Sequence, residues 1–484
     1  MGNEFMKEKS ILKNTIYYLI YNVLNLLFPL ISGIYAARVL SPQNIGEVTY
    51  SQNIVQYFVI LAFLGIPTYG IREISNARKN KEELDKVFSE LFFINFISTL
   101  FFLGLYFILI LSVESFRNYS KLYLIMGMLL LFNIFNINWL YEGLEEFKFI
   151  SLRNIVFKSI SLLLLVWFVK DDTDYLKFAV IMTVGTIGNY LINIIYSRKY
   201  VSLKLKKLNF KRHLKSILYL VSVNIAIEIY TLVDVSMLGF FCVKEIVAYY
   251  VYGSRIYKIL LQVMNTFTMV IVPRLSYLYS ENKKNEFNEI LTEAVKLILL
   301  LGIPMIIGIQ YTSNNIITLI YGDKYITSAA VIKLMSILLV LTPIGYLLGS
   351  RILLITKNEK KMIIAVSLGA ISNTIGNFIL IRYYGEMGAA ISTTLSEILV
   401  MLVYVYLGRK YYKLNLKFKE LIKIIFANLV LFIFLKILNE IEIIKIIKII
   451  VQISIGSMAY FLILILLKEE LIYKKYIKNR RLKL

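Results

Sequence analysis

The 484-residue sequence contains one cysteine, one histidine, two tryptophans and six prolines. Because Cys242 stands alone, the chain can form no internal disulfide and no metal site built from several cysteines. His213, the single histidine, excludes a site with several histidine ligands and a histidine proton relay. His213 lies in the Lys- and Arg-rich stretch 209–215, which predicts a solvated surface position.

Acidic residues are also scarce, since 31 Asp and Glu face 54 Lys and Arg, for a net charge of +23. Apolar residues make up 58% of the chain, whereas soluble domains have about 45–50%. A soluble core cannot bury that surface, because cores stop growing near ~250–300 residues. The composition excludes an ordinary soluble enzyme, a disordered chain and a secreted disulfide scaffold. The cations lie between apolar runs, so we expect anionic membrane lipids as partners and no nucleic acid.

Apolar runs of about 20 residues, the length that a helix needs to cross hydrocarbon, recur along the whole chain. They predict an all-α polytopic membrane protein with about fourteen spanning helices. The predicted spans cover residues 15–38, 47–70, 88–111, 122–141, 150–169, 177–197, 215–240, 246–272, 290–310, 328–350, 362–381, 388–408, 420–438 and 447–467. A transmembrane β-barrel is excluded, because its strands would alternate over ~10-residue segments.

The Lys and Arg residues predict the orientation. With a cytoplasmic N-terminus, the inner segments hold 40 of them and the outer segments hold 11. Cytoplasmic loops carry the excess of Lys and Arg. We therefore predict a multi-pass protein of the cytoplasmic membrane with both termini inside.

A weak internal repeat predicts the domain organisation. Residues 40–75 and 241–276 align without a gap, and the sixth and twelfth spans end alike, in RKY at 198–200 and 409–411. We predict six-helix lobes at 1–205 and 206–413, and two extra helices with a basic tail at 414–484. Parallel repeats of this kind place a substrate site at the interface between the halves.

Two stretches carry a family resemblance. The first reads ARVLSPQNIG at 37–46 and LGIPTYGIREI at 64–74, and the second reads YTLVDVSMLG at 230–239 and AYY at 248–250. With the span count and the repeat, the chain resembles the polysaccharide-transporter branch of the multidrug/oligosaccharidyl-lipid/polysaccharide exporter superfamily. These are the Wzx-type flippases of O-antigen and capsule repeat units.

The resemblance implies a flippase that moves undecaprenyl-pyrophosphate-linked oligosaccharide from the inner to the outer leaflet by alternating access. It implies two lobes around a central cavity and, in some members, coupling to a proton or sodium gradient. Polysaccharide assembly proteins are candidate partners, and no other cofactor is expected.

Charges inside predicted spans are candidates for function, because burying a charge in hydrocarbon is costly. Arg255 and Lys258 share a helix face, and we expect them to bind pyrophosphate or acidic sugars. Glu228 lies at similar depth in the preceding antiparallel span and is the candidate for gradient coupling. A permanent ion pair between Glu228 and either base is the alternative. For Asp234, substrate binding and a structural role at a helix end both remain open.

The first half offers amides instead of charges at mid-span. Gln52, Asn53 and Gln56 are candidates to bind sugar hydroxyls, since neutral amides cost less to desolvate than charges. Interhelical hydrogen bonding is the alternative, and it is favoured for Asn22 and Asn25.

Other polar residues have simpler interpretations. Glu90, Arg153 and Lys158 fall near predicted inner boundaries, where bases snorkel to the interface. A cytoplasmic vestibule that attracts the lipid-linked substrate is the secondary alternative for these residues. The Asp-rich outer loop at 171–174 is expected to be solvated. We find no catalytic constellation, no Walker loop and no metal-binding motif, so no enzymatic activity is expected.

Two rival functions remain. One is a lipid II or multidrug exporter of the same superfamily. The other is a membrane polysaccharide polymerase or glycosyltransferase, which the short outer loops and the single histidine disfavour.

Overall fold

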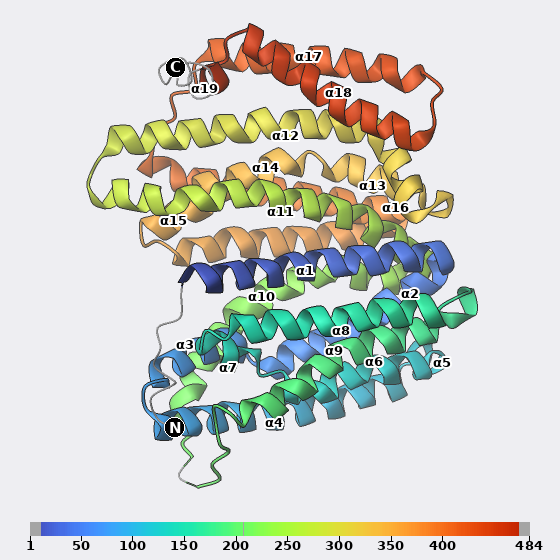
Figure 1. Ribbon diagram of the computed structural model, residues 1–484, viewed down its shortest axis with the longest axis vertical. Coiled ribbons are helices and arrows are strands. Elements are labelled where there is room, and N and C mark those ends of the chain that lie inside the picture. Colours follow the sequence, from blue (N-terminus) through green and yellow to red (C-terminus); the bar gives the residue numbers. More distant parts are fainter. Residues whose placement is uncertain (1–10, 207, 474–484) are drawn as a thin grey trace. The chain divides into compact units, whose positions relative to one another are not determined.

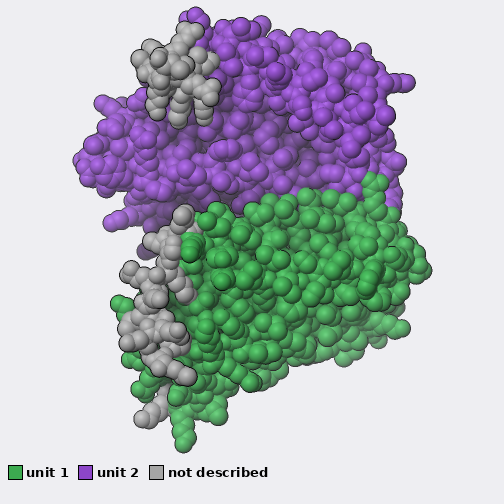
Figure 2. Space-filling view, viewed as in Figure 1, with its two compact units in different colours: residues 1–239, 243–248 green, residues 240–242, 249–484 purple. Residues whose placement is uncertain are grey.

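The computed structural model describes residues 11–206 and 208–473, except for the side chains of 11, 12 and 218–229. The described part is helical and contains no β-strand (Figure 1). It divides into two compact units, residues 1–239 with 243–248 and residues 240–242 with 249–484 (Figure 2).

The first unit is built around long helices with short helices at their ends. In chain order its elements are α1 (Ile11–Val39), α2 (Pro42–Phe63), α3 (Ile66–Ala77), α4 (Lys81–Ser112), α5 (Glu114–Asn118), α6 (Ser120–Phe132), η2 (Asn133–Phe135), α7 (Asn138–Gly143), α8 (Phe147–Phe168), η3 (Asp172–Asp174), α9 (Tyr175–Ser197) and most of α10 (Lys211–Phe241). Its core gathers apolar side chains of α3, α4 and α7, among them Ile74, Leu91 and Trp139.

The second unit has the same all-helical construction. Its elements are most of α11 (Lys244–Ser280), α12 (Lys284–Tyr321), η4 (Asp323–Tyr325), α13 (Ser328–Met335), α14 (Leu338–Gly345), the π-helical turn η5 (Tyr346–Arg351), α15 (Ile352–Ile355), α16 (Lys360–Gly408), η6 (Arg409–Tyr411), α17 (Phe418–Glu440), α18 (Lys445–Leu466) and α19 (Glu470–Ile472).

Within the described residues, twelve helical segments are long and apolar enough to cross a membrane. Helices suit this environment because each satisfies its backbone hydrogen bonds internally. The predicted all-α polytopic fold is therefore confirmed. α10 is not among the twelve, since its described apolar part is only Tyr230–Phe241. The number fourteen stays a prediction.

α16 is a helical hairpin rather than one rod. At 1.5 Å per residue a straight helix of its length would reach ~74 Å, more than twice the ~30 Å of hydrocarbon. Gly385 breaks it, with φ 51° and ψ −127°. On either side of the break, Asn373 Nδ2 donates to Thr393 Oγ1 at 3.2 Å and Ser392 Oγ donates to Asn373 O at 2.9 Å. The two arms match the predicted spans 362–381 and 388–408.

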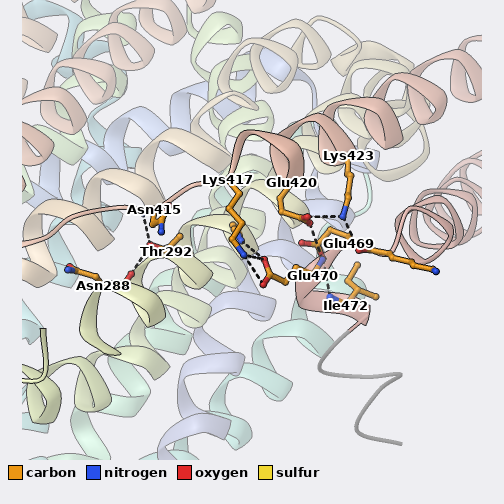
Figure 3. Close-up of polar contacts among 11 residues, drawn as sticks. Asn288, Thr292, Asn415, Lys417, Glu420, Lys423, Glu469, Glu470 and Ile472 are labelled. Carbon is orange, nitrogen blue, oxygen red and sulfur yellow. Dashed lines mark hydrogen bonds and ion pairs between the residues drawn. The ribbon is translucent and has the colours of Figure 1, made fainter. Parts of the chain in front are cut away.

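The two C-terminal helices pack on α12. α17 and α18 run side by side (Figure 1), and apolar residues such as Leu431 and Leu464 join them to Leu300. The Tyr460 hydroxyl donates to Leu300 O at 2.9 Å. Beyond the ends of these helices, Glu470 accepts from Lys417 at 3.2 Å (Figure 3). Glu470 also lies 3.5 Å from Lys296, so one carboxylate joins α12, α17 and α19.

Candidate functional site

The beginning of α2 explains one of the sequence motifs. Ser41 is the N-cap, and its Oγ accepts from Asn44 N at 3.3 Å. Pro42 occupies the first turn, where its missing N–H costs nothing. A Cβ atom added to Gly46 would lie 1.7 Å from Lys244 O. The motif thus caps α2 and lets the backbone at the start of α11 approach it closely.

The predicted amides of α2 occupy two environments. Gln52 and Gln56, one turn apart, are exposed. Asn53 is buried, and its Nδ2 donates to Leu232 O at 3.2 Å and to Ser236 Oγ at 2.7 Å in α10. Of the three predicted amides, Gln52 and Gln56 are therefore available at the surface, whereas Asn53 holds α10.

α10 carries two predicted acids. Asp234 is buried within the first unit. Glu228 lies within the helical range of α10, but its side chain falls outside the described residues.

α11 carries the predicted basic pair in the second unit. Arg255 is half-buried, and its guanidinium carbon lies 5.3 Å from the centre of the Tyr252 ring. The Tyr252 ring stacks on Tyr321 at 4.2 Å. Such a stack supports a guanidinium through cation–π attraction. Lys258 is exposed, three residues further along α11.

Lys158 lies elsewhere than predicted. It stands eleven residues into the 22-residue helix α8, at its centre. Its Nζ donates to Asn25 Oδ1 at 2.6 Å and to Leu24 O at 3.2 Å. Asn25 is the middle residue of α1, so Lys158 is a mid-span cation and not a boundary residue. The predicted span began at residue 150, whereas α8 begins at Phe147, so Lys158 lies deeper in the helix than the prediction placed it.

Arg153 on α8 is also more deeply buried than a snorkelling base. It is 7% exposed. Its Nε donates to Asn189 Oδ1 and its Nη2 to Asn138 Oδ1, both at 3.0 Å. Amide oxygens therefore hold this guanidinium.

The predicted solvated position of His213 is wrong. Its side chain is 1% exposed. Its Nε2 lies 2.8 Å from Glu90 Oε2, and its Nδ1 lies 2.8 Å from the Tyr69 hydroxyl. Glu90 is fully buried, and it contacts Asn209 and Arg212 of the predicted inner loop. The charged neighbours of His213 misled the prediction, because residues adjacent in a helix point in different directions.

The acidic loop after α8 has structural partners. Asp172 Oδ1 accepts from Ser41 N at 2.6 Å and from Asn44 Nδ2 at 2.8 Å. Asp171 caps η3, and Asp174 pairs with Lys177. Across the described ranges, no group of three or more His, Cys, Asp or Glu could hold a metal ion.

A polar groove of about 760 Å³ opens in the second unit between α12, the segment before α17, and α19. Lys296, Lys413 and Lys417 line it together with Glu289, Glu293 and Glu470. The numbers of bases and acids are equal, so the groove has no net preference for an anion. Its Lys417–Glu470 contact holds the C-terminal helices (Figure 3).

The chain is similar in sequence to known transporters. The chain is 24% identical over 397 residues to a putative O-antigen transporter of Shigella dysenteriae, covering 81% of this chain and 98% of that protein. It is also 24% identical over 410 residues to a putative O-antigen transporter of Escherichia coli (strain K12), covering 81% of this chain and 95% of that protein.

A solved structure shares the fold. The lipid II flippase MurJ, in an inward closed conformation, superposes with a TM-score of 0.74 at 20% identity. The likeness covers 96% of this chain and 100% of that chain.

The family described as "Polysaccharide biosynthesis protein" matches residues 11–279, which is more than half of the chain. The resemblance seen in the sequence motifs is confirmed by this match. The chain belongs to the polysaccharide biosynthesis protein family.

Proposed function

We propose that this protein is a flippase that moves undecaprenyl-pyrophosphate-linked oligosaccharide repeat units from the inner to the outer leaflet of the cytoplasmic membrane. Its product serves O-antigen or capsule assembly. The observation that carries the proposal is the match of most of this chain to almost the whole length of O-antigen transporters. These relatives are named as transporters and not as enzymes.

We further propose alternating access between six-helix lobes at residues 1–205 and 206–413, with residues 414–484 adding two helices and a basic tail. Both termini lie in the cytoplasm in this scheme. The 40 to 11 distribution of Lys and Arg supports that orientation.

Arg255 and Lys258 are the proposed pyrophosphate ligands. A guanidinium can bind two phosphate oxygens at once, and an ammonium adds a compact point charge. The stacked Tyr252 and Tyr321 rings support the guanidinium of Arg255 and favour one orientation of it.

Amides are the proposed sugar ligands. Gln52 and Gln56 are exposed one turn apart on α2, and amides both donate to and accept from hydroxyls. Asn53 contacts α10, so it becomes a sugar ligand only in a state in which α2 and α10 separate.

Glu228 is the proposed coupling residue, and Asp234 is its proposed neighbour in substrate or ion binding. A mid-span carboxylate whose surroundings change between two states can bind a proton with different affinity in each. That difference is what a gradient-driven cycle requires.

A cellular experiment tests the function. Deletion of the gene should abolish surface polysaccharide while lipid-linked repeat units accumulate inside, and the wild-type gene should restore display. R255Q and K258Q should restore little display at normal protein levels. R274Q is a matched control, because Arg274 is an exposed base of the same helix. Normal surface polysaccharide in the deletion strain would contradict the proposal and favour a lipid II or multidrug exporter.

A further inference from the structure

We propose that Lys158 and Asn25 form a second anion-binding position, in the first unit, for a phosphate oxygen of the lipid that this protein moves. The inference rests on the proposed function and extends it to a side chain of α8.

Lys158 is held at mid-span by two oxygen atoms that carry no charge. Its ammonium donates to Asn25 Oδ1 and Leu24 O and lies 5.2 Å from the centre of the Phe28 ring. It makes no ion pair among the described residues. Inserting a lysine at the centre of a spanning helix carries a large energetic cost. An uncompensated charge at this depth is a functional candidate by default.

The position presents hydrogen-bond donors. Asn25 Oδ1 accepts from Lys158 Nζ at 2.6 Å and from Asn154 Nδ2 at 3.1 Å. An ammonium can only donate, so it fixes the oxygen of the Asn25 amide toward itself and turns the amide nitrogen away. The Tyr21 hydroxyl, one turn earlier, also lies near this amide. The ammonium has a third N–H beyond its two protein contacts, so the cluster suits an anion that accepts several hydrogen bonds.

The side of α1 that carries Asn25 is exposed and polar. Thr15, Tyr18, Asn22 and Asn25 are exposed at helical spacing. A second exposed stripe is apolar and lies on the opposite side of the helix, formed by Ile16, Leu19, Ile20, Val23, Leu27 and Ile31. Lipid fits the apolar stripe, whereas amides in a spanning helix belong on a hydrated path. Asn25 is therefore placed where a polar headgroup can reach it.

Helix packing keeps the cluster in register. α1 and α8 run parallel, because Ser151 Oγ donates to Tyr17 O at 2.6 Å near one end and Tyr35 Oη donates to Val169 O at 2.8 Å near the other. Residues 151, 154 and 158 occupy one face of α8 at spacings of three and four. Lys158 is thus positioned by contacts on both sides of it.

The simple alternative is that Lys158 only holds α1 and α8 together through its hydrogen bonds. N25D separates the two interpretations, because aspartate is a stronger acceptor for Lys158 and preserves the contact between α1 and α8. It also neutralises the cluster, so the cluster should no longer attract an anion. K158Q removes the cation, and K148Q is the matched control, since Lys148 is an exposed base at the beginning of α8.

The test measures binding to the purified full chain in detergent. The probes are geranylgeranyl pyrophosphate, phosphatidylglycerol and the uncharged geranylgeraniol. N25D and K158Q should weaken pyrophosphate binding about tenfold or more, the loss expected for one charge-assisted hydrogen bond. K148Q should match wild type, and geranylgeraniol should not distinguish the variants.

A selective loss of phosphatidylglycerol binding in N25D would support the anion position and assign it to a resident phospholipid. Wild-type affinity of N25D for both anionic probes would overturn the inference while leaving the flippase proposal intact. A failure of the proposed function would give a different result. The deletion strain would then display normal polysaccharide, independently of how N25D binds the probes.

Discussion

Glu90 organises the connection between α9 and α10 within the first unit. Its carboxylate is fully buried and accepts from Asn209 N at 2.6 Å, Arg212 Nε at 2.7 Å and His213 Nε2. A buried carboxylate is tolerated only when donors of this kind satisfy it. Glu90 therefore accepts one backbone N–H and two side-chain N–H groups at the start of α10.

His213 makes this cluster sensitive to pH. Burial lowers the pKa of His213 below its ordinary value, although the Glu90 carboxylate opposes the shift. Arg212 lowers this pKa further and Glu73 raises it. With neutral His213, the Tyr69 hydroxyl donates to Nδ1 and Nε2 donates to Glu90.

We predict that acid destabilises the protein partly through His213. A lowered pKa means that the unfolded chain binds more protons, so this contribution is complete above pH ~6.5 and declines as the pH falls below that value. Thermal unfolding of purified wild type and H213Q from pH 8 to pH 5 measures it. Wild type should lose more stability than H213Q over this range. Parallel curves would contradict the prediction.

The sequence identified candidate residues more readily than their surroundings. Arg255, Lys258 and the α2 glutamines were selected because charges and amides inside apolar runs are conspicuous, and their roles stay predictions. The predicted positions of Lys158 and His213 were wrong. The depth of Lys158 depends on where α8 begins, and the burial of His213 depends on which face of α10 packs against α3 and α4. A single sequence does not contain those packing contacts.

At the level of elements, Gly385 turns α16 into a hairpin. Its φ of 51° and ψ of −127° are readily adopted only by glycine. We predict that G385A costs ~1–3 kcal/mol, the usual penalty for a strained backbone residue. The apparent melting temperature of the purified protein should fall.

G308A is the control for this substitution. Gly308 lies in α12, and an added Cβ there would meet nothing within 4 Å. Alanine in a helix interior is favoured over glycine by ~1 kcal/mol, so G308A should match or exceed wild type. A melting temperature of G385A equal to that of G308A would show that the hairpin turn does not need glycine.

Helices were predictable because apolar runs have the length of a membrane crossing. Residues 328–350 appeared as one run, but the chain is divided there into α13, α14 and a π-helical turn. Apolar composition cannot reveal such breaks, since they depend on local hydrogen bonding. Within residues 360–408, by contrast, the two predicted spans were separated correctly, because the break at Gly385 lies between them.

For the whole molecule, the charge distribution predicts topology. Reporter fusions at Lys204 and Lys483 should both give cytoplasmic signals, because the flanking segments are rich in Lys and Arg. Fusions at Lys244 and Lys324, in predicted outer segments, provide the opposite control. A signal from outside the cytoplasm at Lys204 or Lys483 would contradict an even number of spans with both termini inside.

Lipid flipping by the purified protein tests the central claim most directly. The protein is reconstituted into liposomes that carry a lipid-linked oligosaccharide with a fluorescent sugar, and an added membrane-impermeant quencher reports the outer-leaflet fraction over time. Wild type should make the inner-leaflet pool accessible within the assay, R255Q and K258Q should slow this at least about tenfold, and R274Q should match wild type. Quenching by wild type that stops at the level of protein-free liposomes would contradict the account.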